Sequence, residues 1–292
     1  MSERWIERSL FACALFCALM VSAVFGFLLY FSLPLFTDAA GLAGVLSMAW
    51  KPFQGSYGIL PMIAGTFCLT VPALLLSYPL AIGVSCFAHG LAPARIAKTV
   101  MAMVYFMTSI PTVIYGFVSV FVLVPFFRQS FDRGTGFCLI AASLTLAILI
   151  LPTIVLSLES ELGQRSEEIG MAAKSLGLTP AQELLWVLLP CSGKGLVTAA
   201  VLGFGRAVGD TLVALMVAGN APLIPHSLLD PIRALTSHIA LVVATDSQDL
   251  AYYSIFAAGL MLFVIIACLT VFIRFLAKEL ATAEARSPNE AR

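Results

Sequence analysis

An arginine and an aspartate lie four residues apart within an otherwise apolar stretch of the chain. Arg206 and Asp210 belong to the segment 195–219, which is long enough to cross a bilayer and places Arg206 near its middle. A charge at that depth costs at least about 2.5–3.5 kcal/mol on insertion scales, so such residues usually face a partner or a watery path. The pair therefore indicates a conduit for a solute rather than a lipid-facing anchor.

The chemistry of this pair suits a tetrahedral oxyanion. On a continuous helix, residues four apart share a face, so Arg206 and Asp210 are expected to enter one cavity or to pair with each other. A guanidinium donates to two oxygens at once, and a nearby carboxylate would moderate that attraction and could accept a proton from a protonated phosphate. The alternative is a structural ion pair that fixes helix packing. Gly205 and Gly209 have GxxxG spacing, which predicts close approach of another backbone.

The composition is that of an integral membrane protein. Of 292 residues, 60% are hydrophobic and only 11% are charged, whereas soluble domains carry about a quarter charged residues. The formal net charge of zero argues against nucleic acid as a partner. The seven cysteines include no CxxC and are interpreted as small hydrophobic residues. The three histidines are scattered, so we expect no metal site.

The apolar blocks predict an all-α, polytopic membrane protein that forms one transmembrane domain over 1–292. Continuous rather than alternating hydrophobicity favours helices as the spanning form. Prolines inside the second and third spans, such as Pro72, Pro79 and Pro111, are expected to kink these helices. Six transmembrane helices are predicted, at about 9–33, 59–87, 97–126, 136–158, 192–219 and 251–276.

Lysine and arginine set the expected orientation. If the N-terminus is cytoplasmic, eleven of these residues lie on that side and four on the other, which predicts that both termini are cytoplasmic. The segment 159–191 is then a cytoplasmic loop and 220–250 is extracytoplasmic. The apolar stretch 231–244 is too short to span and is expected to form a re-entrant or surface helix. The cytoplasmic set is Arg4, Arg8, Arg95, Lys98, Arg165, Lys174, Lys194, Arg274, Lys278, Arg286 and Arg292, and the opposite set is Lys51, Arg128, Arg133 and Arg233.

The 159–191 loop is predicted to form two short helices. Residues 165–176 are helix-prone, and Gly177 is a natural C-terminal stop. Thr179 can cap a second helix that has Pro180 at its first position and Glu183 near its third. Small side chains just before the stop would let another protein's backbone approach closely.

This loop resembles the EAA loop of bacterial ABC-importer permeases, which docks on a separate ATPase subunit. Met171 stands where the family has a glutamate, so the role of that glutamate is not carried over. The resemblance rests on the spacing of two alanines, a glycine and a proline thirteen residues later. It implies a coupling surface formed by Glu168, Ala172, Ala173, Gly177 and Pro190.

Further motifs are similar to those of phosphate-type permeases, and of the PstC-type subunit in particular. The resemblance extends over nearly the whole chain, and its motifs lie at 57–66, 109–116, 206–211, 216–220 and 228–236. Asp210 stands where the family usually has glutamate. The resemblance implies the type I permease fold of ABC importers and a substrate path that includes Arg206, Asp210 and Thr211.

The chain has no GxxxxGK[ST] phosphate loop, so it is not expected to be an enzyme or to hydrolyse ATP itself. The resemblance implies a second permease subunit, an ATPase dimer that holds ATP and magnesium, and an extracytoplasmic phosphate-binding protein. It also implies a bacterial inner-membrane location. Three alternatives stay open: a permease for another oxyanion or the sister phosphate subunit, a proton-coupled secondary transporter that uses Asp210, and a membrane scaffold.

Overall fold

The computed structural model describes residues 2–38, 41–131, 134–244 and 250–286 and is almost wholly helical. The contacts between residues divide the chain into two compact units. The first comprises 1–61 and 238–265, and the second comprises 62–237 and 266–292. The predicted single domain over 1–292 stays a prediction. The all-α prediction is confirmed, because the strands β1 (Trp50–Lys51) and β2 (Ser56–Tyr57) form only a two-residue antiparallel hairpin.

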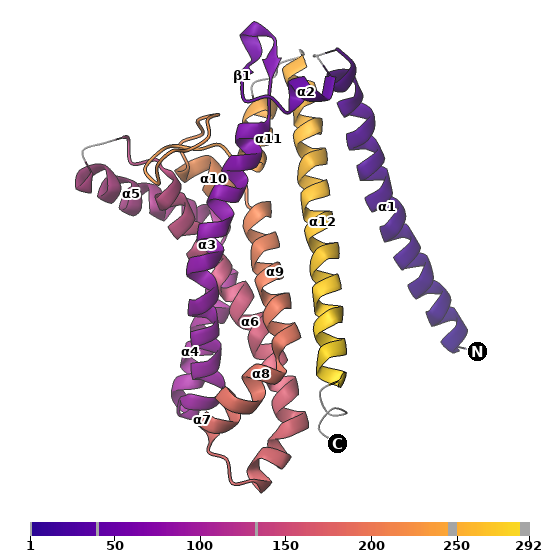
Figure 1. Cartoon of the computed structure of the whole chain (residues 1–292), viewed down its shortest axis with the longest axis vertical. Coiled ribbons are helices and arrows are strands. Elements are labelled where there is room, and N and C mark those ends of the chain that lie inside the picture. The colour runs from indigo at the N-terminus through magenta and orange to yellow at the C-terminus, as the bar shows by residue number, and fades with distance from the viewer. Residues whose placement is uncertain (1, 39–40, 132–133, 245–249, 287–292) are drawn as a thin grey trace. The chain divides into compact units, whose positions relative to one another are not determined.

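The first unit is built on two long helices, α1 (Ser2–Asp38) and the first part of α12 (Leu250–Arg286). They lie side by side (Figure 1) and pack through aromatic rings, with Phe31 stacked on Phe256 at a centroid distance of 5.0 Å. Beyond α1 come α2 (Gly41–Val45), the β1–β2 hairpin and the short 3-10 helix η1 (Pro52–Gln54). The helix α11 (Leu235–Ala244) confirms a short helix within the apolar 231–244 stretch.

The second unit holds most of the helices. Its core residues come mainly from α6, with further contributions from α3 and α10, and Leu146, Ile150 and Ile154 of α6 are almost fully buried. Its elements are α3 (Leu60–Cys86), the π-helix η2 (Phe87–Leu91), α4 (Ala94–Ser109), α5 (Thr112–Ser130), α6 (Leu139–Ser175), α7 (Pro180–Gln182), the π-helix η3 (Glu183–Leu188), α8 (Leu189–Cys191), α9 (Gly193–Gly209) and α10 (Leu212–Val217).

Among the described residues, five helices are long and apolar enough to cross a membrane, or six if the bent pair 180–191 and 193–209 counts as one span. The third predicted span, 97–126, is not one kinked helix. It breaks at Ile110 and Pro111, because proline disfavours the α conformation of the preceding residue and Ile110 is extended. Figure 1 shows α5 running across the direction of α3 and α6. By contrast, Pro72 and Pro79 lie inside an unbroken α3.

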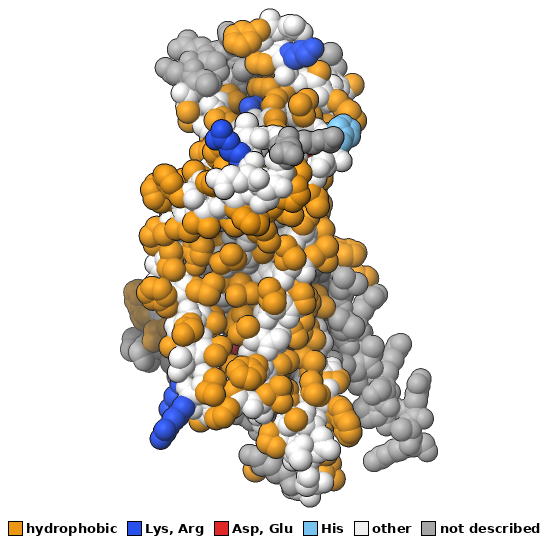
Figure 2. Space-filling model, turned by 90° about the vertical axis from the view of Figure 1, so that its left-hand side faces the viewer, with side chains coloured by type: hydrophobic (Ala, Val, Ile, Leu, Met, Phe, Trp, Pro, Cys, Tyr) orange, Lys and Arg blue, Asp and Glu red, His pale blue; other side chains and the backbone are white. Residues whose placement is uncertain are grey.

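The outer surface of the protein is strongly apolar. Figure 2 shows one face on which hydrophobic side chains cover most of the surface and lysine and arginine are sparse. On α5 alone, Phe117, Phe121 and Phe126 are more than half exposed. Such a surface suits contact with lipid tails or with partner helices in a membrane.

Candidate functional site

The predicted continuous helix over 192–219 is wrong, because it breaks at Asp210. The helix α9 ends at Gly209, and α10 begins at Leu212. Asp210 itself is extended, with φ −77° and ψ 124°. Arg206 and Asp210 therefore do not share one helical face, as was expected. Arg206 belongs to the last turn of α9, and Asp210 belongs to the break that follows it.

Asp210 caps the helix that follows the break. Its carboxylate is buried, and Oδ2 accepts a hydrogen bond of 2.8 Å from the backbone N–H of Val213, as an N-cap residue does. The Thr236 hydroxyl donates to the Asp210 carbonyl at 3.1 Å. Within the described part of the chain, Oδ1 accepts no hydrogen bond. One carboxylate oxygen is thus structural, and the other is available to a ligand.

Arg206 lies in the last turn of α9 with its side chain exposed. No ion pair joins it to Asp210 or to any other described carboxylate, although the two charges are close enough to interact through space. A cation is also favoured at a helix C-terminus. The guanidinium therefore lies near the break, and its donors have no hydrogen-bond partner among the described residues. Thr211, the third predicted path residue, is half-buried at the start of α10 and makes no side-chain cap.

The rotation of α9 is fixed by a ladder of small residues on its buried face. Gly195, Ala199, Gly203 and Ala207 recur every four residues and are all buried. A Cβ at Gly203 would lie 2.6 Å from the Ile154 side chain of α6, and one at Gly195 would overlap the Glu161 side chain of α6. This spacing is the small-xxx-small pattern that lets helices approach closely in membranes.

The row of α9 residues next to this ladder is more exposed than the ladder itself. Thr198, Leu202 and Arg206 are exposed and Lys194 is half-buried, again at intervals of four residues. The predicted packing role of Gly205 and Gly209 is not realised within the described chain, because a Cβ at either would meet no atom within 4 Å. The packing glycines are instead Gly195 and Gly203, and the small-residue ladder is what presents Arg206 outward.

The segment that follows α10 is tied back onto three helices. The Ile232 N–H donates to Ala218 at 2.8 Å, and the Leu235 N–H donates to the Thr66 hydroxyl of α3 at 2.9 Å. The N–H groups of Leu139 and Ile140, at the start of α6, donate to the carbonyls of residues 230 and 228. These bonds fix the end of α10 and so support the break at Asp210.

Two residues of this support lie in motifs that the sequence analysis selected, but their structural role was not predicted. Asn220 has a positive φ of 56°, donates to the Leu215 carbonyl at 2.6 Å, and accepts from the Arg233 Nε at 2.8 Å. Burial lowers the pKa of the Arg233 guanidinium, which lies outside the spanning helices. Gly65 of α3 lies so close to the Arg233 carbonyl that a side chain would collide with it. The motifs over 57–66, 216–220 and 228–236 therefore meet in one structural support.

The predicted coupling loop is largely a continuation of α6. Residues 165–175 are helical as expected, but they extend the spanning helix rather than form a separate one, and the turn is confined to 176–179. Gly177 has a φ of +69°, which confirms it as the helix stop. Thr179 caps α7 as predicted, but Gln182 rather than Glu183 completes the capping box, because its side chain is at the third helical position.

Apolar side chains are exposed around this turn and form what we name the loop patch: Met171, Leu176, Leu185 and Trp186. Met171 is 80% exposed and Trp186 is 71% exposed. Of the predicted coupling residues, Ala172, Gly177 and Pro190 are exposed, Ala173 is buried, and the side chain of Glu168 lies outside the described residues.

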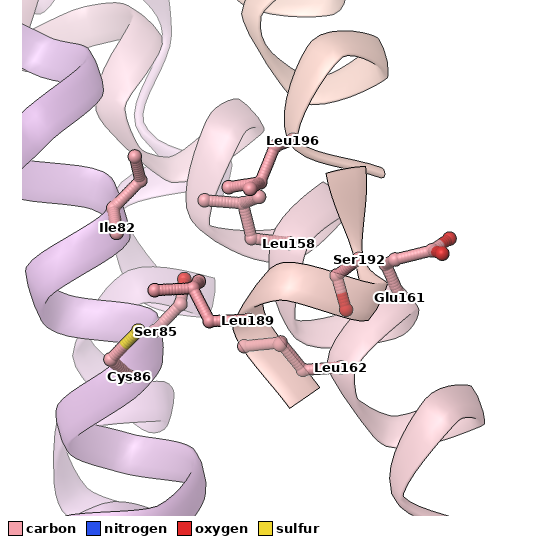
Figure 3. A pocket seen from close by; sticks show the side chains of 9 residues that line it. All are labelled: Ile82, Ser85, Cys86, Leu158, Glu161, Leu162, Leu189, Ser192 and Leu196. Carbon is pink, nitrogen blue, oxygen red and sulfur yellow. The ribbon is translucent and has the colours of Figure 1, made fainter. Parts of the chain in front are cut away.

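A water-sized void lies under the bend between α8 and α9, where the two helical segments meet at 72°. Its volume is about 10 Å³, and α3, α6, α8 and α9 line it (Figure 3). Ile82, Leu158 and Leu196 point into it, whereas the Glu161 carboxylate points away. The bend is thus packed on apolar side chains. The described residues contain no group of three or more His, Cys, Asp and Glu that could hold a metal ion.

Replacing Asp210 by alanine should destabilise the protein without unfolding it. The loss of an N-cap costs about 1 kcal/mol, which corresponds to a fall in Tm of about 2–4 °C for a chain of this size class. Asp210→Asn keeps an oxygen that can accept from Val213 and should melt nearer the wild-type temperature. Thermal unfolding in detergent measures both. Equal melting of Asp210→Ala and the wild type would contradict the capping role.

The comparisons with known proteins show the family to which this chain belongs. The family described as "Binding-protein-dependent transport system inner membrane component" matches residues 81–282. The chain belongs to this family. The "Probable ABC transporter permease protein YqgH" of Bacillus subtilis (strain 168) is 34% identical over 79% of this chain and 75% of its own length. The "Phosphate transport system permease protein PstC" of Pasteurella multocida (strain Pm70) is 29% identical over 95% of this chain and 91% of its own.

The fold is also that of a solved permease. An inward-facing structure of the MetNI methionine ABC transporter covers 79% of this chain and 99% of its own, with a TM-score of 0.61 and 19% identity. This confirms the predicted all-α fold of the type I ABC-importer permeases. The protein is a multi-pass membrane protein of the inner-membrane permease family.

Proposed function

We propose that this chain is a permease subunit of an ATP-driven importer for inorganic phosphate. The broken helix at Asp210 carries the proposal. Non-helical backbone at membrane depth is tolerated only where protein buries it or water reaches it. Here the break lies beside an exposed Arg206, and one oxygen of Asp210 is available to a ligand. Similarity to several PstC proteins supports phosphate as the oxyanion.

The substrate path in this proposal consists of Arg206, Asp210 and Thr211. The guanidinium binds two phosphate oxygens, and the free oxygen of Asp210 accepts a proton that phosphate carries and sulfate lacks. A carboxylate beside the arginine also weakens anion binding enough to permit release. The Gly205 and Gly209 surfaces, which meet nothing within the described chain, are available for the second permease subunit across the path.

In this proposal, the ATPase acts on the substrate path by binding to the loop patch. We assign its side of the membrane to the cytoplasm, with both termini, because the predicted topology puts eleven of the lysines and arginines on that side. The exposed Met171 and Trp186 then face an ATPase dimer, which holds ATP and magnesium. The small Ala172 lets that partner's backbone approach. An extracytoplasmic phosphate-binding protein delivers the substrate to the opposite side.

The test is uptake of labelled phosphate by proteoliposomes that contain both permeases and the ATPase, with binding protein and ATP supplied. Uptake should require ATP and should be inhibited by arsenate, a tetrahedral anion of similar protonation, but not by sulfate. Equal competition by sulfate would point to a general oxyanion permease. Uptake by this chain alone, driven by a proton gradient without ATP, would instead establish a secondary transporter and overturn the proposal.

A further inference from the structure

A polar cleft lies between α6 and the start of α9, on the same end of the second unit as the loop patch. Its volume is about 290 Å³, room for several waters. The residues that line it are Ser157, Glu161, Gln164, Arg165, Lys194, Gly195 and Thr198. The cleft is distinct from the apolar void under the α8–α9 bend, since the Glu161 carboxylate points away from that void (Figure 3).

One of the two cations that line this cleft is not paired with a described carboxylate. Arg165 and Glu161 form an ion pair one helical turn apart, with Nε 3.3 Å from Oε1. Lys194, in contrast, pairs with no carboxylate in the described part of the chain. Two cations and one anion give the lining a formal charge of +1 (2 − 1), and Ser157, Gln164 and Thr198 add neutral donors. This set of side chains suits a small oxyanion.

Lys194 also stands on the exposed row of α9 that leads to Arg206. The two residues are twelve positions apart, or about 18 Å along the helix axis. Thr198 and Leu202 lie between them in the same row and are exposed. Because twelve residues make about three and a third turns, the two side chains start about 120° apart around α9, with Arg206 at the break and Lys194 at the cleft.

We propose that this cleft is a second oxyanion site, which takes a phosphate-type anion on the cytoplasmic side of the path. The inference rests on the proposed function, because it places the cleft after Arg206 on the route of the anion towards the cytoplasm. The phosphate group of an anionic lipid has the same chemistry as free phosphate. We commit to the free anion, because the proposed function carries free phosphate past Arg206 on the same helix.

The experiment measures binding of labelled inorganic phosphate to the nucleotide-free permease–ATPase complex in nanodiscs of phosphatidylcholine. Lys194→Gln should weaken one binding component about tenfold or more, because it removes a charge-assisted hydrogen bond. Lys194→Arg should retain that component. Glu161→Gln, which removes the negative charge from the cleft at constant shape, should tighten it. Lys98→Gln, an exposed lysine of α4 outside the cleft, is the matched control and should bind as the wild type does.

Arg206→Gln in the same assay separates this inference from the proposed function. If Arg206→Gln weakens phosphate binding while Lys194→Gln behaves as Lys98→Gln, the second site is overturned and the path remains. If the wild type binds no phosphate and Arg206→Gln changes nothing, the proposed function fails as well. Repeating the titration with phosphatidylglycerol tests the lipid: a Lys194-dependent lipid affinity without a Lys194-dependent phosphate affinity would overturn the free-anion site.

Discussion

Arg206→Gln should reduce phosphate uptake by at least about a hundredfold while leaving the assembly of the complex intact. The exposed guanidinium has no described ion-pair partner, so its removal leaves no unpaired charge behind. Each hydrogen bond from a charged donor contributes about 1.5–3 kcal/mol, and a bidentate contact contributes two. Arg206→Lys keeps the charge but loses the two-pronged geometry, so its rate should be intermediate.

Initial rates of ATP-dependent uptake in proteoliposomes measure this effect, and co-purification measures assembly. Arg95→Gln, at an exposed position of α4, is the control for the loss of one positive charge. Wild-type rates in both Arg206 variants would show that the break at Asp210 is only a packing feature. Transport lost together with assembly would indicate the structural ion-pair alternative, now with a residue of the second permease.

Trp186→Ala should weaken the association of the ATPase by about thirtyfold or more. Tryptophan is enriched among the interface residues whose truncation costs 2 kcal/mol or more, and Trp186 is 71% exposed beside the other residues of the loop patch. Because its side chain contributes little to the core of the second unit, the variant should fold normally. Its phosphate binding at Arg206 should be unchanged, while ATP hydrolysis is no longer linked to uptake.

The matched control is Trp5→Ala, since Trp5 is 73% exposed on α1. Co-purification of the ATPase with each variant, with and without an ATP analogue, gives the comparison. If the Trp186 and Trp5 variants retain the ATPase equally, the loop patch is not the contact, and another surface must receive the ATPase.

The sequence was informative wherever hydrophobic length or local capping decides the structure. All six apolar blocks are largely helical, four of them as a single helix, Gly177 stops α6, and Thr179 caps α7. The two helix breaks were missed, because an apolar block of bilayer length has the same composition whether it is continuous or interrupted. A signal for the second break exists: Gly209 precedes Asp210, a favoured N-cap residue whose third following position is Val213.

The candidate site was predicted by residue type but not by geometry. Charged residues in an apolar span were enough to select Arg206 and Asp210. Their relation depends on the break, which in turn depends on bonds from Thr236 and on the support formed by Asn220 and Arg233. These partners lie ten or more residues away along the chain, so no local pattern indicates them. The packing ladder of α9, in contrast, was visible as a four-residue repeat from Gly195 to Ala207 and was overlooked in favour of Gly205 and Gly209.

The unbroken α6 has a mechanical consequence. Its 37 residues make a rod of about 55 Å that extends from the membrane interior to the turn at Gly177. Pro152 lies inside it and has no backbone N–H to donate to the preceding turn, so the helix is expected to bend most easily there. From Pro152 to Ala173 the arm is about 32 Å, so a tilt of about 5° shifts its tip by about 3 Å. Since α9 contacts this arm at Glu161 through Gly195, and contacts Ile154 beside Pro152 through Gly203, we expect a push at the tip to move the start of α9 more than its end at Arg206.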